Sequence, residues 1–228
     1  MFLMSGTDLA IGLAAFLLLW YLAGLYLGRR RGGALVRQVR DSLQTFGGQA
    51  TIRWIGRSAF RIEVESPASP LKKLGVSLVL EPRETFLLWL VWRCFGRRDW
   101  LMVGVSVQGT VKAICDVYHP RRRGALDAAH EVRSLGWTAE PLPGRPELLH
   151  AAPGKEGRAL AQAVLAVLRG MDVWQVRIRH KEPQLVVSLP VPTSETRVPL
   201  PIFTLLPQLV DCVLAGRRRT EAGEGTDG

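Results

Sequence analysis

The stretch 9–40, "LAIGLAAFLLLWYLAGLYLGRRRGGALVRQVR", decides how this protein is organised. From Leu9 to Leu27 it carries no charge, and as a helix at ~1.5 Å per residue this run spans about 28 Å. Since that length matches the hydrocarbon core of a bilayer, we predict one transmembrane helix at 9–27. A cleaved signal peptide would carry positive charge before its apolar run, whereas the charged side chain that precedes this run is Asp8.

The arginines that follow the uncharged run set the expected orientation. Arg29, Arg30 and Arg31 come directly after it, and positive charge beside a membrane helix favours the cytoplasmic side. We therefore expect residues 1–8 to form a short extracytoplasmic N-terminus, with the rest of the chain after the helix in the cytoplasm. The membrane would be the plasma membrane in a prokaryote and the endoplasmic reticulum in a eukaryote.

Residues 28–47 are predicted to continue the helix as a basic juxtamembrane segment. Leu35, Val39 and Leu43 recur at helical spacing, so this segment should leave the membrane and pack on the domain below. Small residues in the span either seat a partner helix, because they allow helices to approach closely in lipid, or reflect ordinary membrane-helix composition. They form two pairs, Gly24 with Gly28 and Ala10 with Ala14.

The body of the protein, residues 48–216, is predicted to be a single cytoplasmic α+β domain. A hydrophobic content of 47% with 22% charged residues suits a globular body. Strand and helix patterns mix here without the strict alternation of a doubly wound sheet. Phe60, Ile62 and Val64 alternate with charged residues, which predicts a half-buried strand. The polar tail 217–228, first basic and then acidic, is predicted to be disordered.

Turn residues and hydrophobic periodicity divide the body into elements. In the helix expected at 122–135, Leu126, Ala129 and Leu135 should face inward. The predicted strands are 50–55, 60–65, 74–82, 100–108, 111–119, 173–180 and 184–190, with short strands around Trp137 and Leu148. The predicted helices are 83–95, 122–135, 155–170 and 201–215.

No pattern in the chain indicates catalysis, so we predict a non-enzymatic protein with no catalytic residues, no cofactor and no metal. Cys94, Cys115 and Cys212 are widely spaced and include no C-x-x-C pair, which favours free thiols over a disulfide framework. The acidic and histidine clusters at 115–119 and 127–131 lack a recognised ligand spacing. The stretch "APGKEG" at 152–157 lacks the first glycine and the final Ser or Thr of a P-loop.

A net charge of +10 favours an anionic partner. Its arginine runs are either solvated loops beside a membrane or contacts to anionic lipid or RNA. No motif that reads RNA sequence is present, and no DNA partner is expected. The predicted contact residues are Arg29, Arg30, Arg31, Arg97, Arg98, Arg121, Arg122, Arg123, Arg217, Arg218 and Arg219.

The segment 86–92, "FLLWLVW", is apolar on every side for about two helical turns and far too short to cross a bilayer. One interpretation is a buried core helix. The other is a helix that lies at the membrane interface or docks on the membrane helices of a partner. In the second interpretation the contact residues are Phe86, Trp89, Leu90 and Trp92.

In their order, these elements resemble the calumin family, the coiled-coil membrane subunit of the PAT (protein associated with translocon) complex. Three stretches carry the resemblance: "FLLWLVWRCFGRRDWLMVGVSV" at 86–107, "QLVVSLPVP" at 184–192 and "LPIFTLLPQLVDCVLAGRRR" at 200–219. It extends over residues 9–219. The chain would be a short form of the family that lacks its luminal domain and its C-terminal coiled coil.

The resemblance implies a scaffold or chaperone-like subunit that assists insertion and folding of multipass membrane proteins near the translocon and ribosome. It implies membrane lipid, the translocon and a small multi-helix membrane protein similar to Asterix as partners. Ribosome or ribosomal RNA contact is a further expectation, although the family makes that contact through the coiled coil that this chain lacks. Two other functions stay open: a membrane-tethered enzyme or ligand sensor, and a structural subunit of another membrane complex.

Overall fold

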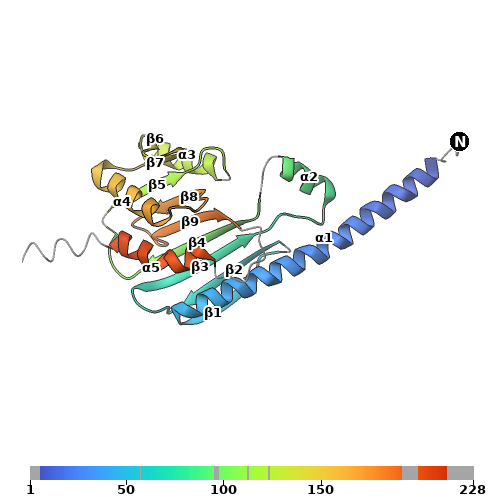
Figure 1. Cartoon of the computed structure of the whole chain (residues 1–228), viewed down its shortest axis with the longest axis horizontal. Helices are drawn as coiled ribbons and strands as arrows, with labels where there is room; N and C mark the ends of the chain where they lie inside the picture. Colours follow the sequence, from blue (N-terminus) through green and yellow to red (C-terminus); the bar gives the residue numbers. More distant parts are fainter. Residues whose placement is uncertain are drawn as a thin grey trace, which may run out of the picture.

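A computed structural model describes residues 6–56, 58–94, 98–111, 113–122, 124–191 and 200–214. Its most prominent element is helix α1 (Gly6–Leu43), which extends far beyond the folded body at its N-terminal end (Figure 1). The expected membrane span and the expected basic helix are therefore two halves of one continuous helix. Gly32 lies at the junction, where a Cβ atom would stand 3.3 Å from the Leu80 side chain, so the missing side chain lets α1 approach the sheet closely.

The strands in the described residues form one nine-stranded antiparallel sheet in the order β1-β2-β3-β4-β9-β8-β5-β7-β6. The first four strands follow one another as a meander, and the C-terminal strands β9 and β8 connect this meander to β5. The strands are β1 (Gln49–Trp54), β2 (Ala59–Glu65), β3 (Leu71–Val79), β4 (Trp100–Val107), β5 (Cys115–Tyr118), β6 (Glu140–Leu142), β7 (Arg145–Ala151), β8 (Gln175–Ile178) and β9 (Leu185–Pro190).

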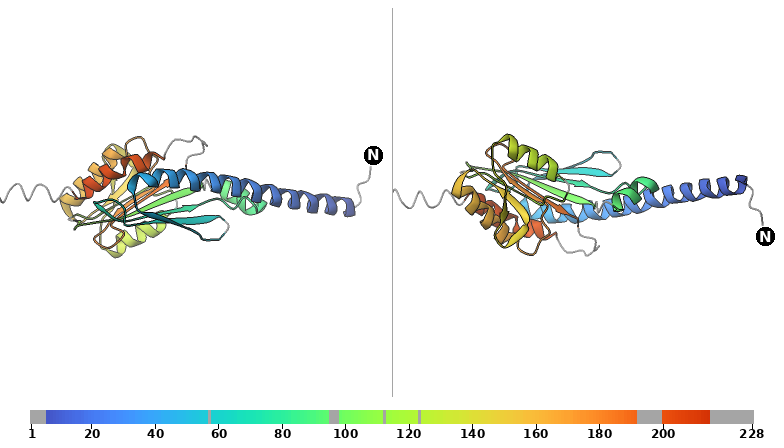
Figure 2. Two further views of the ribbon diagram at one scale, coloured as in Figure 1. Left: turned by 90° about the horizontal axis from the view of Figure 1, so that it is seen from below. Right: turned by 90° about the horizontal axis from the view of Figure 1, so that it is seen from above.

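Helices cover the two faces of the sheet unequally. The C-terminal half of α1 lies on one face together with α4 (Gly154–Val167) and α5 (Pro201–Leu214), while α3 (Ala125–Ser134) lies on the other (Figure 2). A short 3-10 helix, η1 (Gln44–Phe46), ends α1 and leads into β1. A long N-terminal apolar helix followed by a mixed body with an antiparallel sheet is the α+β arrangement that the sequence predicts.

The main core lies between the sheet and the three helices α1, α4 and α5. The predicted alternation in β2 is confirmed, since Phe60, Ile62 and Val64 are buried and their charged neighbours are exposed. From α1, Leu35, Val39 and Leu43 join the same core, as their helical spacing predicts. Burial of these side chains attaches α1 to the body over its last turns, so the N-terminal half of α1 is held rigidly rather than through a flexible linker.

The inward face expected for α3 is confirmed at Ala129, which packs against the small core under α3, and is wrong at its two leucines. Leu126 is 84% exposed and Leu135 is also exposed, whereas Ala125, Ala128 and Val132 are buried. The i, i+3, i+7 spacing of those three residues makes an equally regular stripe, and its small side chains let α3 lie close to the sheet. Both stripes have helical spacing, so periodicity alone does not show which of them faces the sheet.

Helix α2 (Phe86–Cys94) lies in the connection between β3 and β4, which leaves and re-enters the sheet at the same end. β3 ends at Val79 and β4 begins at Trp100, and these two residues are paired in the sheet. We call this end of the sheet the α2 end. Because neighbouring strands are antiparallel, the turn between β1 and β2 also lies here, since Ala59 pairs with Val79.

Candidate membrane-contacting site

The N-terminal half of α1 has the composition and the surroundings of a membrane helix. It is long and apolar enough to cross a bilayer, and it is the one such helix among the residues that the structure describes. Its large apolar side chains have almost no protein around them, as in Leu9 at 66% and Leu13 at 58% exposure. A surface of this size and polarity is far more apolar than water tolerates on a soluble monomer.

Helix α2 packs beside this apolar half through a cluster of aromatic rings. Phe86 lies edge-on to Trp20 and to Phe16, with ring centroids 4.8 Å and 5.6 Å apart. The ring of Trp89 is 5.4 Å from that of Trp20. Edge-to-face and tilted rings at these distances attract one another beyond the area they bury. The indole Nε1 of Trp20 also donates a hydrogen bond to the carbonyl oxygen of Arg83, 3.0 Å away.

Gly24 is the position on α1 that allows this approach. A Cβ atom there would stand 2.7 Å from both the carbonyl carbon of Arg83 and the Cα of Glu84, so only glycine fits. The other half of the predicted GxxxG pair, Gly28, has open space around it. Gly24 therefore packs within its own chain, whereas a partner helix at Gly28 stays a prediction, as it does for the exposed Ala10 and Ala14.

The outward face of α2 is apolar and uncovered. Helix α2 contains no buried residue in the described structure, and Leu87, at 69% exposure, is its most open large side chain. The interpretation of α2 as a buried core helix is therefore wrong. Of the predicted membrane or partner contacts, Phe86 and Trp89 instead pack against α1 of the same chain, while Trp92 is half-buried and Leu90 is exposed. Contact of α2 with a membrane or a partner stays a prediction. Uniform apolarity cannot distinguish a protein core from lipid, because both solvate apolar side chains.

The level of α2 along α1 can be estimated from helix geometry. Trp20 lies seven residues before Leu27, the end of the uncharged run, or about 10 Å at 1.5 Å per residue. Phe16 lies about 16 Å from that end, and helix α2 contacts both Trp20 and Phe16, so α2 lies beside the middle of the expected span. The two helices together make a short apolar unit, which we call the α1–α2 unit.

A buried carboxylate joins the base of the α1–α2 unit to the sheet. Asp99 is buried, and its Oδ2 accepts from Arg31 of α1 at 3.0 Å and from Arg83 at 3.2 Å. Its Oδ1 accepts from the backbone N–H of Glu81 at 2.7 Å. Burial and the nearby Asp99 charge raise the pKa of Glu81, while Arg83, Arg93 and Arg31 oppose that rise. Arg31, a predicted lipid or RNA contact, thus has its partner within the protein.

The other predicted basic contacts fall into three groups. Arg29, Arg30, Arg98 and Arg121 are exposed, whereas Arg97, Arg123 and Arg217–Arg219 lie outside the described residues. Arg122 is half-buried: its guanidinium lies 5.8 Å from the centre of the Trp174 ring and 3.9 Å from the Asp172 carboxylate. Contact of these arginines with lipid or RNA stays a prediction.

Sheet register shows where the 119–122 loop lies relative to α2. Tyr118 pairs with Gln175, Gln175 with Ser188, and Ser188 with Met102. Met102 is two residues from the start of β4, so the loop after Tyr118 leaves the sheet at its α2 end. Exposed Arg121 and Arg98, which come just after β5 and just before β4, are therefore at the α2 end of the body. Exposed Arg29 and Arg30 directly follow the apolar part of α1.

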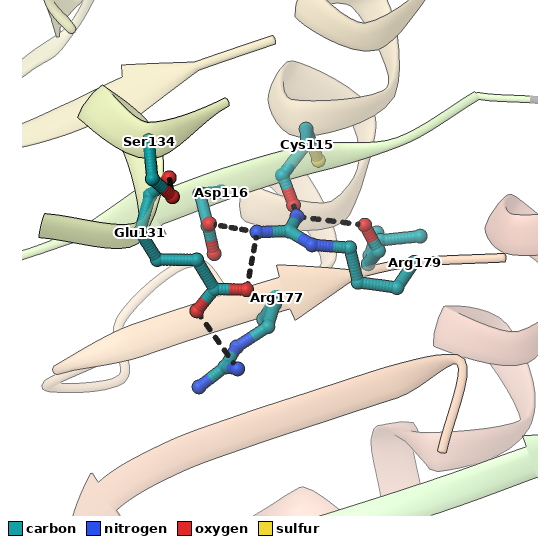
Figure 3. A network of polar contacts seen from close by, with 7 residues as sticks. Cys115, Asp116, Glu131, Ser134, Arg177 and Arg179 are labelled. Carbon is teal, nitrogen blue, oxygen red and sulfur yellow. Dashed lines mark hydrogen bonds and ion pairs between the residues drawn. The ribbon is translucent and has the colours of Figure 1, made fainter. Parts of the chain in front are cut away.

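A second charged network lies under α3, on the opposite face of the sheet (Figure 3). Asp116 is fully buried and forms an ion pair with Arg179, which also reaches Glu131 of α3 at 3.2 Å. Arg177 bonds the other oxygen of Glu131 at 3.0 Å, and the guanidinium of Arg179 lies 4.9 Å from the centre of the Trp137 ring. Burial raises the pKa of Asp116, and the Arg179 charge offsets this only in part. These contacts tie α3 to β5 and β8.

Cys115 and Asp116, which were weighed together as metal ligands, point away from each other. Cys115 belongs to the main core while Asp116 faces α3, so their side chains lie on opposite faces of β5, as predicted. Burial raises the pKa of the Cys115 thiol to about 12, which keeps it protonated and unreactive near neutral pH. In the described ranges, no group of three or more Cys, His, Asp or Glu side chains could hold a metal ion.

Comparison with known proteins does not place the chain in a family. No protein-family model matches the sequence, and no curated protein matches it either. The functional interpretation therefore depends on the α1–α2 unit and on the way Asp99 joins it to the body. Sequence reasoning missed Asp99; its signal was a lone carboxylate directly after Arg97 and Arg98, at the point where an apolar helix returns to a strand.

Proposed function

We propose that this protein is a membrane-anchored scaffold or chaperone-like subunit that holds membrane segments of multipass proteins during their insertion and folding. The observation that carries the proposal is the exposed apolar face of α2, held beside α1 at the level of the expected span. An apolar face of this kind is covered in the cell by lipid tails or by another protein's membrane helices.

Rigid attachment favours protein contact over simple anchoring. A membrane anchor needs only α1, whereas this chain adds a second apolar helix and fixes it to α1 and the sheet at two points. One point is the aromatic cluster around Trp20, and the other is the buried Asp99 with its two arginines. Pre-organised surfaces bind with less loss of conformational entropy, so a fixed two-helix face suits recognition of a third helix.

The surroundings of the α1–α2 unit support a site near the machinery of membrane-protein insertion. In this proposal residues 1–8 lie outside, the body is cytoplasmic, and exposed Arg29, Arg30, Arg98 and Arg121 face lipid headgroups or ribosomal RNA. The translocon and a small multi-helix membrane protein similar to Asterix are the proposed partners. The proposed mechanism needs no catalytic centre, because the α1–α2 unit acts by covering apolar surface of the membrane segments that it holds.

Site-specific photo-crosslinking tests the proposal. A photoreactive phenylalanine analogue at Leu87, on the open face of α2, should crosslink to newly made multipass membrane proteins in their native membrane. The matched control is the same analogue at Leu135, an exposed leucine on the body, which should give no such adduct. Adducts at Leu87 that contain lipid alone would overturn the chaperone role and leave an anchored domain.

A further inference from the structure

The turn between β1 and β2 exposes two large apolar side chains. Trp54 ends β1 at 50% exposure, and Ile55 follows it at 55%. The N–H of Ile55 donates to the carbonyl oxygen of Ala59 at 2.8 Å, and Gly56 takes a φ of 79°, which favours glycine. Exposed Trp and Ile side chains at the tip of a hairpin are unfavourable in water and are typical of a surface that contacts a membrane or another protein.

The tip lies at the α2 end of the sheet, close to the end of the expected span. Trp54 rests against the Phe60 ring and against α1 at Gly32, where a Cβ atom would be 3.5 Å from the indole. Gly32 is five residues beyond Leu27, or about 7.5 Å along the helix. The chain in β1 runs back toward the N-terminal half of α1 (Figure 1), and Ile55 follows the last residue of β1. At ~3.3 Å per strand residue, Ile55 lies about 4 Å on the body side of the level of Leu27.

Charge around the tip matches an anionic surface. Arg29 and Arg30 of α1 and Arg53 of β1 are all exposed. Indole rings are enriched at the headgroup level of bilayers, where an apolar ring with a polar N–H is well solvated. Arginine beside such a ring is attracted to anionic phospholipid when it lies near the membrane surface.

We propose that the tip, Trp54 and Ile55, lies in the headgroup layer of the bilayer, against anionic phospholipid. This inference depends on the membrane anchoring of α1 in the proposed function, but not on the chaperone role. Together with α1 and α2, the tip gives the body a third contact with the membrane. Three contacts that are not in line fix the tilt of the sheet, and therefore the direction in which the open face of α2 points.

Spin-label accessibility measures the depth of the tip in the full-length protein. The protein is reconstituted in vesicles of phosphatidylcholine and phosphatidylglycerol, with one nitroxide at Ile55→Cys. Cys94 and Cys212 are replaced by serine and alanine, while Cys115 stays because it is buried and unreactive. Matched labels are Leu13→Cys in the expected span and Gln49→Cys at the other end of β1, which is also exposed.

The rates at which each nitroxide collides with oxygen and with a water-soluble nickel complex give the depth of each of the three labels in the bilayer. We expect Leu13 to be deep in the hydrocarbon, Gln49 to be in water, and Ile55 to lie between them at the headgroup layer. If Ile55 is as accessible to nickel as Gln49 while Leu13 is deep, the hairpin proposal is wrong and the anchor stands. If Leu13 itself is in water, both the anchor and the hairpin contact are wrong.

Discussion

Two residues, Gly24 and Asp99, determine whether α2 can lie beside α1. Gly24 provides the space, because the backbone of residues 83–84 occupies the place of its missing side chain. Asp99 provides the carboxylate that forms ion pairs with both Arg31 and Arg83. Neither residue has a chemical role of its own, so each is best tested through stability.

Substitution of Gly24 tests whether α1 and the backbone of residues 83–84 need this glycine to pack closely. Gly24→Ala places a Cβ atom into the Arg83 backbone, which cannot turn aside as a flexible side chain could. We expect a loss of about 1–3 kcal/mol, as for other overpacked sites, seen as a lower midpoint of thermal unfolding in detergent. The control is Gly28→Ala, which has open space and should change little. Equal effects of the two substitutions would contradict the role of Gly24.

Removal of the Asp99 carboxylate should be far more costly than removal of a surface partner. Asp99→Ala leaves two arginines and the N–H of Glu81 without their acceptor in a partly buried site. We expect a loss of about 3 kcal/mol or more in detergent unfolding experiments. Asp172→Ala, which removes a half-exposed partner 3.9 Å from Arg122, should cost less than about 1 kcal/mol. Similar costs would show that Asp99 does not organise the base of α2.

Asp116 should make a measurable contribution to pH dependence. Its folded-state pKa is raised by burial, so the folded protein keeps this proton at pH values where the unfolded chain, with a pKa of about 3.9, has lost it. The contribution of Asp116 to stability is therefore greatest at acid pH and decreases as pH rises through the folded pKa. Asp116→Asn removes this titration. The stability of the wild type relative to this variant should fall as pH rises above the unfolded pKa and level off above the raised folded-state pKa, and a difference independent of pH would refute the assignment.

At the scale of elements, sequence periodicity predicts most of the sheet and helices but not the position of α2. Alternation in β2 and helical spacing in α1 are local signals, since one face of each element meets the core. Helix α2 is apolar all round, so its sequence does not indicate which face meets α1. Its neighbours come from residues about 65 positions away, as in the contact of Trp20 with Arg83, and no local pattern encodes such a pairing. For the same reason the sequence predicts which residues of α2 are candidate contacts, but not that α2 rests on Trp20.

Crosslinking tests the position of α2 beside α1 in the native membrane. Cysteines at Phe16 and Phe86, whose rings are 5.6 Å apart, should join through a short bismaleimide in a background without Cys94 and Cys212. Leu17 lies about 100° further round α1, so the pair Leu17 and Phe86 should react much less. Equal yields from the two pairs would mean that α2 is not held against one face of α1.

At the scale of the whole molecule, α1 connects two environments. Its first half is apolar and uncovered, while Leu35, Val39 and Leu43 in its second half belong to the core of the body. The body presents exposed arginines and the β1–β2 tip at the same end as α2. A bilayer that meets this end would cover the apolar surface and contact the positive charge, which is the arrangement on which the proposed function depends.

The most direct test of this account is the depth of Leu87 in a bilayer. The full-length protein, labelled at Leu87→Cys with an environment-sensitive fluorophore and reconstituted in liposomes, is exposed to lipids that carry a quencher in their acyl chains and to iodide in the water. We expect strong quenching by the lipids and little by iodide, because α2 lies beside the membrane span. Strong quenching by iodide with none from the lipids would place α2 in water and contradict the central claim.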